Sequence, residues 1–500
     1  MSSSPTTSRA VRWRPLCLAA AYLLIVAHVL HWKLAGRTLT SIQLSEAGRF
    51  AAEGVATAAF FYFAILTVIT MVFGRFFCAW ACHMLAVQEG CRWLLARLRI
   101  RPRPLRVRAL RLAPFAAAFY IFLFPVAQRL WLGVPFPTPQ IQLTTDHMWA
   151  TLPSPWSGVF TLIVCGLLLV YFLGSLSFCK YVCPYSAVFA IADRLAPGRI
   201  RLTGECDGCA KCSAACTTGV RVHAEVQQRG AVTNSGCMRC LECVNACPRQ
   251  ALAYRFGRPA LFQPPVTDPR YDFTLAEEAV LLGLGVATFV ALNGLYDAVP
   301  LLLAMGLSLL VAYFGVVAVR LVRESAVSLR GVALKDAGRL SRAGGAFAMA
   351  MGLMLVLVGH SLLMQYHHRR AAAVLDGLGF PRLAAFEGRA RTEAVAAVHH
   401  LTMCTRYGLT DTFDWNMKLA WLARGLADSD AVEQHLRRAI ARDPRQPVAH
   451  FNLGKELARQ GRRDEAVHAF TEAIHLDPKF KQFVPQPFVT RALGTSAATS

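Results

Sequence analysis

CDGCAKCSAAC (206–216) and CMRCLECVNACP (237–248) are two four-cysteine runs with the same 2-2-3 spacing, separated by twenty residues. Gaps of two residues allow three thiolates to cap three corners of one cubane, and the fourth cysteine, one helical turn further on, points to a neighbouring cluster. The spacing therefore predicts two [4Fe–4S] clusters. One would be held by Cys206, Cys209, Cys212 and Cys247, and the other by Cys216, Cys237, Cys240 and Cys243.

This pattern is that of a bacterial two-cluster ferredoxin. Paired C-x-x-C motifs also build zinc ribbons, but zinc sites use two cysteine pairs, not two matched runs of four. Disulfides are disfavoured because neighbours this close in an ordered loop make poor cross-links.

The composition indicates a membrane protein. Of the 500 residues, 55% are hydrophobic and 17% charged, and the mean hydropathy is +0.39. The formal net charge of +23 comes mainly from arginines between long apolar runs, which favours topology signalling over nucleic-acid binding. Fifteen of the sixteen cysteines lie at or before Cys247, as expected if that part faces a reducing compartment and the tail an oxidising one.

Seven apolar runs are expected to span the membrane, the first as a retained anchor behind a polar, arginine-bearing leader. They are 15–32, 54–73, 112–127, 156–178, 279–296, 298–319 and 343–364. Pro114 and Pro125 make the third the weakest of these runs.

The orientation follows from the basic residues in the short loops. With a cytoplasmic N-terminus, the inner segments 1–14, 74–111 and 320–342 carry 18 lysines and arginines, and the outer segments carry 4. The positive-inside rule then puts the cysteine-rich loop in the cytoplasm and everything after Met364 outside, in a bacterial inner membrane. The basic segment 84–98 is expected to lie along the inner membrane surface; an RNA- or DNA-binding reading of 92–111 is the weaker alternative.

Two further cysteine pairs are expected at the inner ends of the second and fourth spans: Cys78-x-x-x-Cys82 and Cys179-x-x-x-Cys183. On a helix this spacing puts both sulfurs on one face. Four convergent thiolates could hold a metal or a third cluster, or form a switchable dithiol; alternatively they are small packing residues. Cys82-His83 is near the haem motif C-x-x-C-H, but the extra residue and the inner location argue against haem.

GRFFCAWAC (74–82), FCKYVCP (178–184) and the double cysteine run together resemble the membrane polyferredoxin group. That group is typified by the quinol dehydrogenase subunit of nitrate reductase and by the nitrous-oxide-reductase regulator, with the copper-reducing accessory protein of cytochrome oxidase as a more distant relative. The resemblance covers about residues 50–255. It implies electron transfer at the inner membrane between a quinol pool or cytoplasmic donor and an extracytoplasmic redox enzyme. The eight cysteines above match the family's cluster ligands.

The chain departs from this group in two places. His83 replaces the first proline of the paired C-x-x-x-C-P elements, and the last three spans and the tail lie outside the resemblance, so the partner does not carry over. No flavin-attachment motif is present in the sequence.

The tail shows a 34-residue period. AIARDP (439–444) is repeated as AIHLDP (473–478), and Leu453, Gly454, Leu457 and Phe470 fall on tetratricopeptide positions. One good and one degenerate repeat fall short of a self-sufficient solenoid, so 376–412 or a partner is expected to complete the stack, whose concave face would bind protein. A plain helical hairpin is the alternative. Residues 481–500 are expected to be a disordered end.

Three histidines lie near the outer ends of the first and last spans: His28, His31 and His360. They are either a quinol site or hydrogen-bonding residues at the interface.

The sequence as a whole predicts a mainly α polytopic membrane protein with an inserted α+β two-cluster ferredoxin domain and a tetratricopeptide-like tail. The expected domains are 1–178, 179–260, 261–364 and 365–500. The predicted function is electron transfer through two [4Fe–4S] clusters, with a membrane, the quinone pool and an extracytoplasmic redox protein as partners and no nucleic acid. The alternatives are an assembly factor that reduces or hands on a metal through the paired cysteines, and a scaffold whose clusters are structural.

Overall fold

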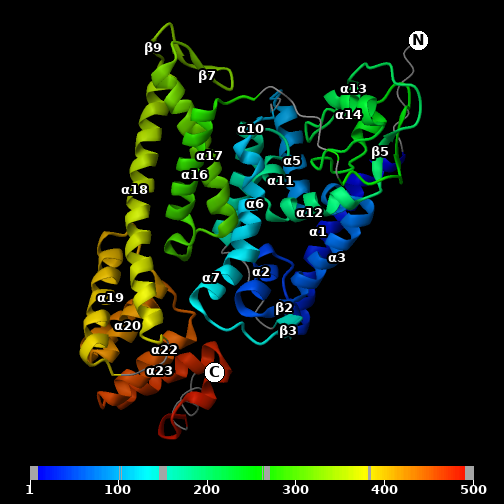
Figure 1. Cartoon of the computed structure of the whole chain (residues 1–500). Coiled ribbons are helices and arrows are strands. Elements are labelled where there is room, and N and C mark those ends of the chain that lie inside the picture. Colours follow the sequence, from blue (N-terminus) through cyan, green and yellow to red (C-terminus); the bar gives the residue numbers. More distant parts are fainter. Residues whose placement is uncertain are drawn as a thin grey trace. The chain divides into compact units, whose positions relative to one another are not determined.

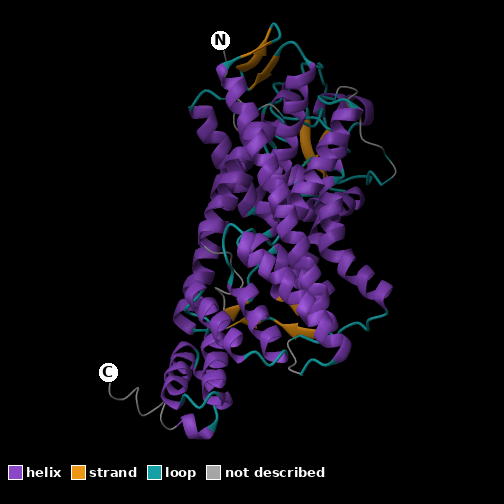
Figure 2. Ribbon diagram, turned by 90° about the vertical axis from the view of Figure 1, so that its left-hand side faces the viewer, coloured by secondary structure: helices purple, strands orange, loops and turns teal. Residues whose placement is uncertain are grey.

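Helices account for most of the chain in the computed structural model, and its strands are short (Figure 1, Figure 2). The structure describes residues 9–489, except Arg101, Arg103, 146–154, Phe262, 264–270 and 381–384. The chain forms two units. The first comprises Met1–Val286 and Leu301–Ala348, and the second comprises Ala287–Pro300 and Met349–Ser500. Residues 1–8, which include the start of the expected leader, and residues 490–500 lie outside the described residues.

Six helical segments among the described residues are apolar and long enough to cross a hydrocarbon layer about 30 Å thick. They are Trp13–Ala35, Ala109–Leu132, Pro155–Leu173, Leu275–Leu292, Leu301–Arg323 and Arg342–Gly377. They correspond to six of the seven expected spans.

The remaining expected span, 54–73, forms a shorter helix. Residues Val55–Thr57 pair as strand β2 with β3 (Gln140–Gln142), so helix α3 runs only from Ala58 to Phe73. Its 16 residues give a length of about 24 Å. The count of seven spans therefore stays a prediction.

The helices of the first unit include several that end or change geometry at identifiable residues. In the Ala109–Leu132 segment, the π-helical turn η2 (Phe119–Leu123) directly precedes α7 (Phe124–Leu132). Pro125 lacks a backbone N–H, which accounts for the local change of helical hydrogen bonding.

The basic segment forms α5 (His83–Arg97), with Leu85, Gln88 and Leu95 buried and Trp93 exposed.

The other elements of this unit are the following: α1 (Arg9–Ala35), β1 (Thr38–Leu39), α2 (Leu44–Glu53), α4 (Phe76–Trp80), η1 (Ala109–Arg111), α6 (Ala113–Ala118), β4 (Thr144–Thr145), α9 (Pro155–Leu162), η3 (Ile163–Leu168), α10 (Leu169–Leu173), α11 (Ser177–Tyr181), α12 (Pro184–Leu195), α16 (Leu275–Leu292, continuing into the second unit), α17 (Leu301–Arg323), β7 (Val327–Leu329), β8 (Val332–Asp336) and β9 (Arg339–Leu340).

The cysteine-rich loop folds around a two-stranded antiparallel sheet. Strand β5 (Arg199–Leu202) pairs with β6 (Leu252–Arg255), so the sheet joins the two ends of the loop. Three short helices lie between them: α13 (Lys211–Ala214), α14 (Val222–Arg229) and α15 (Glu242–Asn245). Ile200, Val226 and Leu252 are buried in one core with several of the cysteines. This is the inserted α+β element that the cysteine spacing predicted.

The second unit is helical. Its elements are η4 (Leu295–Asp297), most of α18 (Arg342–Gly377), α19 (Gly388–Tyr407), α20 (Phe413–Gly425), α21 (Ser429–Arg442), α22 (Pro447–Arg459), α23 (Arg463–Leu476) and η5 (Pro478–Phe483). The pairs α20/α21 and α22/α23 are the two expected repeats. Gly454 is needed because a Cβ there would lie 2.7 Å from the buried Phe470 ring.

Both ends of this stack are covered. Helix α19 buries Ala397 and Leu401 in one cluster with Trp415 of α20, as expected of a helical cap. At the other end Val484 is buried, and the Phe488 ring lies 5.4 Å from that of Phe470. The prediction of disorder is therefore wrong for 481–489, because this segment supplies apolar side chains that close the last repeat.

Candidate functional site: the ferredoxin loops and a four-cysteine junction

The two cysteine runs have matching backbones. In each, the third cysteine lies in a short helix (α13 or α15), and the residue two positions before it, Ala210 or Leu241, is in the left-handed conformation, with φ of 56° and 65°. The repeated 2-2-3 spacing thus produces the same turn twice, which is the geometry that lets three sulfurs converge.

The first predicted ligand set comes together in the fold. Cys206, Cys209, Cys212 and Cys247 line one pocket, with Pro248 beside them. Cys247 arrives from the second run, in accordance with the crossed pattern in which the fourth thiolate of each run serves the other cluster.

The second set also gathers, in a more buried place. The Cys243 thiol lies close enough to Cys237, Cys240 and Cys216 to interact with each electrostatically. Burial raises the pKa of the Cys240 thiol to about 12 and also raises that of Cys243. These thiols would stay protonated without a compensating positive charge, which bound iron supplies.

Within the described ranges, no three His, Cys, Asp or Glu side chains are placed to hold one ion. The ligand assignment itself stays a prediction.

The Cys78/Cys82 and Cys179/Cys183 pairs do not lie on single helices, so that part of the sequence prediction is wrong. Each pair spans a break between helices. Cys78 is in α4 and Cys82 is the N-cap of α5, while Cys179 is in α11 and Cys183 is the N-cap of α12. Pro184 at the first position of α12 explains the second break, because proline cannot donate the hydrogen bond that would continue α11.

This geometry puts the second cysteine of each pair at a helix N-terminus, where a thiolate is favoured. Burial raises the pKa of Cys82 to about 11, while backbone N–H groups of Met84 and Leu85 oppose the rise. Burial likewise raises the pKa of Cys183 to about 12, opposed by the N–H of Ser186.

The two pairs converge, although about 100 residues separate them. Burial raises the pKa of Cys179, and Cys82, Cys183 and Cys78 are all close enough to raise it further. Gln88 of α5 connects the two elements: its Nε2 donates to Cys179 Sγ at 3.1 Å, and its Oε1 accepts from the Phe178 N–H at 3.1 Å. We refer to Cys78, Cys82, Cys179 and Cys183 as the four-cysteine junction.

The junction contacts the ferredoxin loop directly. Trp80, which lies between Cys78 and Cys82, donates its indole N–H to the Arg239 carbonyl at 3.1 Å, next to Cys240. Arg14 makes a second link. Its guanidinium pairs with Glu89 of α5 at 3.0 Å and with Glu242 of α15 at 2.7 Å.

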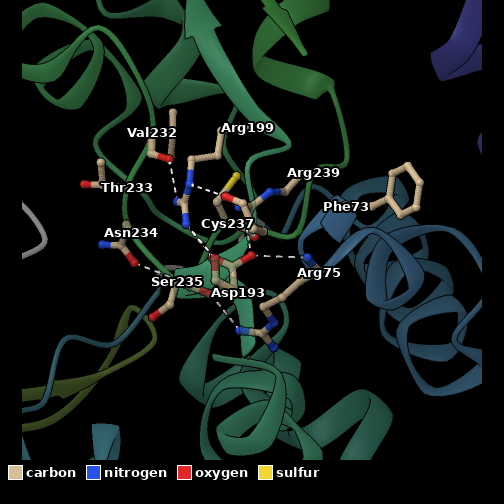
Figure 3. A network of polar contacts seen from close by, with 12 residues as sticks. Phe73, Arg75, Asp193, Arg199, Val232, Thr233, Asn234, Ser235, Cys237 and Arg239 are labelled. Atoms are coloured by element: carbon tan, nitrogen blue, oxygen red, sulfur yellow. Dashed lines mark hydrogen bonds and ion pairs between the residues drawn. The ribbon is translucent and has the colours of Figure 1, made fainter. Parts of the chain in front are cut away.

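A buried ionic network holds the same contact (Figure 3). Arg239, between Cys237 and Cys240, pairs through Nη1 with Asp193 Oδ1 of α12 at 2.8 Å, and neither side chain is exposed. The Arg75 N–H also donates to Asp193 Oδ1, at 3.2 Å. Arg199 of β5 donates from Nη2 to the Asp193 carbonyl at 2.5 Å. Burial opposes the charge on Arg239, but Asp193 and Cys237 raise its pKa overall.

Gly74 allows the close approach of these elements. Its φ is +72°, and a Cβ there would lie 2.6 Å from Arg239 Nε. The glycine that opens GRFFC is thus required by both its backbone conformation and the guanidinium above it.

The three candidate histidines make hydrogen bonds to the protein. His28 Nε2 lies 3.0 Å from the Leu39 carbonyl, and His31 Nδ1 lies 3.0 Å from Thr38 Oγ1. In the second unit, His360 Nε2 lies 2.9 Å from the Tyr407 carbonyl. These contacts fit the hydrogen-bonding alternative, and the quinol site stays a prediction.

Sequence reasoning missed Asp193, Trp80, Gln88 and Arg14. Asp193 carried a usable signal, since it is an isolated carboxylate ten residues after Cys183 in a largely apolar helix. The partners of the other three come from distant parts of the chain, so no local pattern marks them.

Comparison with known proteins agrees with this description. A 4Fe-4S dicluster domain matches residues 199–248, a 4Fe-4S binding domain matches 55–102 and again 156–203, and a tetratricopeptide repeat matches 447–480. Each 4Fe-4S binding-domain segment contains one pair of the four-cysteine junction. No solved structure matches the chain.

Among curated proteins, the chain is 30% identical over 220 residues to YccM of Escherichia coli strain K12, named for a proposed role in electron transport. That alignment covers 41% of this chain and 58% of YccM. An uncharacterised protein of Methanocaldococcus jannaschii, MJ0750, is 20% identical over 210 residues, which are 39% of this chain and 77% of that protein. The chain thus carries 4Fe-4S domains, a C-terminal tetratricopeptide repeat and apolar helices long enough to cross a membrane, and it spans little more than half the length of YccM.

Proposed function

We propose that this chain carries single electrons through two [4Fe–4S] clusters to or from the four-cysteine junction at the inner face of a bacterial cytoplasmic membrane. The clusters, when bound, supply the electron-accepting chemistry. The chain's residues bury the clusters and set the distance between the ferredoxin loop and the membrane-side cysteines. A quinol or a cytoplasmic donor stands at one end of this path, and an extracytoplasmic redox protein at the other.

The observation that carries the proposal is the contact between the junction and the loop around Cys237–Cys243. Trp80 reaches from the Cys78/Cys82 turn to the Arg239 carbonyl. On the other pair, Lys180 lies close enough to Cys216 and Cys179 to interact with both thiols electrostatically. The Cys78/Cys82 pair therefore has a neighbour that contacts the residue before Cys240, and the Cys179/Cys183 pair has a neighbour close to Cys216.

The proposed orientation of the chain in the membrane is supported by the excess of basic residues in the short segments 1–14, 74–111 and 320–342. With the ferredoxin loop inside, the tetratricopeptide tail is outside, where it would dock the acceptor or donor.

The test is the iron content and the electron paramagnetic resonance spectrum of the purified membrane protein after reduction with dithionite. Two clusters correspond to about eight irons per chain. An iron content far below this value together with no low-temperature signal would contradict the proposal. An iron content clearly above eight per chain in the wild type, together with about eight per chain in the double variant Cys78→Ala/Cys179→Ala, would show that the junction holds a further iron centre.

A second function is favoured by the convergence of the four junction thiols: an assembly factor that reduces or transfers a metal for a respiratory enzyme. The same double variant separates the two functions in cells. Lost turnover with a fully metallated partner enzyme supports electron transfer, whereas a metal-deficient partner supports assembly.

A further inference from the structure

The first unit contains a cavity of about 840 Å³ that the proposed electron path does not use. It lies where two candidate spans end: α10 contributes Tyr171 and Phe172, and α17 contributes Tyr313, Val317 and Arg320. Residues that follow α5 and the first turn of the β7–β8 hairpin form the other walls. With α10 and α17 in the membrane, the cavity begins at the level of the lipid headgroups.

The lining carries charges of both signs, on Arg99, Arg320, Arg330, Asp272 and Glu324. Glu277, outside the lining, pairs with Arg320 at 2.5 Å and balances one of the three positive charges. The other two arginines then face two carboxylates. A ligand with one charge of each sign therefore matches this lining better than a simple anion does.

Two of the arginines have a backbone conformation that favours glycine. Arg99 directly follows the C-cap of α5 with φ 60°, and Arg330 opens the two-residue turn of the β7–β8 hairpin with φ 52°. Arg330 Nη2 donates to the Phe172 carbonyl at the end of α10. Arg99 is exposed, and its guanidinium has no partner among the described residues. A left-handed arginine whose side chain makes no contact within the fold points to a ligand.

The deeper wall of the cavity is aromatic. Tyr313 lies ten residues before the end of α17, about 15 Å further into the span. Its ring is 6.2 Å from that of Phe172 and 6.3 Å from that of Phe273. The cavity is thus charged near the helix ends and aromatic towards the middle of the span, which suits an amphiphile.

We propose that this cavity binds the headgroup of a phospholipid of the phosphoethanolamine class, with its phosphate at Arg99 and Arg330. Its ammonium would face Asp272 and Glu324, and its glycerol carbons the aromatic wall. Guanidinium groups match phosphate oxygens in geometry and charge, and the volume is in the range of ligand pockets. This inference goes beyond the electron path and rests only on the membrane placement of α10 and α17.

The test is a lipid titration of the delipidated full chain in detergent, with bound lipid counted by native mass spectrometry. Phosphatidylethanolamine is expected to bind at about one lipid per chain and about tenfold more tightly than phosphatidylglycerol, which lacks the ammonium. Arg99→Gly should weaken this binding about tenfold. Arg97→Gln, at the end of α5 and outside the lining, is the matched control and leaves it unchanged. Glu324→Gln should reduce the preference for phosphatidylethanolamine.

Thermal stability separates a ligand-binding role of Arg99 from a structural one. Because glycine is favoured at this left-handed position, Arg99→Gly should leave the thermal midpoint of the lipid-free chain unchanged or raise it. A lower midpoint, tighter binding of phosphatidylglycerol, or an equal loss of binding in Arg97→Gln would each overturn the inference.

The water-soluble glycerophosphoethanolamine distinguishes the two sources of the same headgroup. It is expected to bind more weakly than the lipid, because it lacks the acyl chains. Equal affinity would assign the cavity to a soluble phosphodiester and overturn the lipid proposal. Lipid binding requires no iron, so missing clusters contradict the electron-transfer proposal alone, and failed lipid binding in a chain with full clusters contradicts the cavity proposal alone.

Discussion

Removing the carboxylate of Asp193 is expected to weaken the contact between the ferredoxin loop and the four-cysteine junction. In Asp193→Ala the buried guanidinium groups of Arg239 and Arg199 lose their anionic partner, and both side chains are at most 1% exposed. Breaking a buried ion pair from one side costs about 3–5 kcal/mol, because a charge remains without compensation. Asp193→Asn keeps the shape and one acceptor oxygen, so its cost should be smaller.

The assay is loss of the visible cluster absorbance in a urea series, with iron content measured beforehand. Glu53→Ala is the matched control, since the Glu53 carboxylate pairs with Arg49 at 2.8 Å on the surface, where Glu53 is 53% exposed. Exposed pairs contribute at most about 1 kcal/mol. If Asp193→Ala lost its clusters at the same urea concentration as Glu53→Ala, the network would not be what holds the loop in place.

Three further substitutions test other parts of the structure. Gly74→Ala should release the clusters at a lower urea concentration than the wild type. The Gly74 backbone, with φ 72° and ψ −170°, lies in a region that essentially only glycine adopts, so alanine there costs about 1–3 kcal/mol in addition to the displacement of Arg239. Gly90→Ala, in a helix with open space around it, should be neutral or stabilising, and equal behaviour of the two variants would contradict this. Phe470→Ala should destabilise the tail by about 3–5 kcal/mol, measured by its resistance to proteolysis, because the ring is fully buried. Burial lowers the pKa of His435 in the folded chain. Neutral His435 therefore contributes fully to the stability of the tail above pH 6.5, and this contribution is lost as the pH falls through the lower folded pKa. The tail should become less protease-resistant on acidification below pH 6.5, and His435→Gln should flatten this dependence.

Local patterns were sufficient to predict the parts of the chain whose geometry is set by neighbouring residues. The 2-2-3 cysteine spacing specifies the turns that bring three sulfurs together, because gaps this short leave the backbone between the cysteines little choice of conformation. Long apolar runs predicted six of the helices, since a span is limited by its own length and hydropathy. The 34-residue sequence repeat predicted the α22/α23 helix pair, because Leu453, Gly454 and Phe470 contact one another within one repeat.

Where local cues conflicted, the structure corrected them. The C-x-x-x-C spacing fits a helical face, but the backbone breaks between the two cysteines of each pair, and Pro184 was the local sign of this in the second pair. Residues 481–489 were expected to be disordered because they belong to the last twenty residues of the chain, yet Val484 and Phe488 pack on an apolar surface of the last repeat. Packing against a preformed surface overrides a weak local preference.

The meeting of the ferredoxin loop with the membrane-side cysteines was decided only by the tertiary structure. Residues 74–82, 178–184 and 237–243 are far apart in the chain, and their contacts depend on Trp80, Asp193 and Arg239 being buried together. A buried charge is tolerated only when its partner is in place. No spacing rule in one sequence can supply that partner. The cysteine runs thus establish which cofactor the chain holds, whereas the fold establishes what lies beside it.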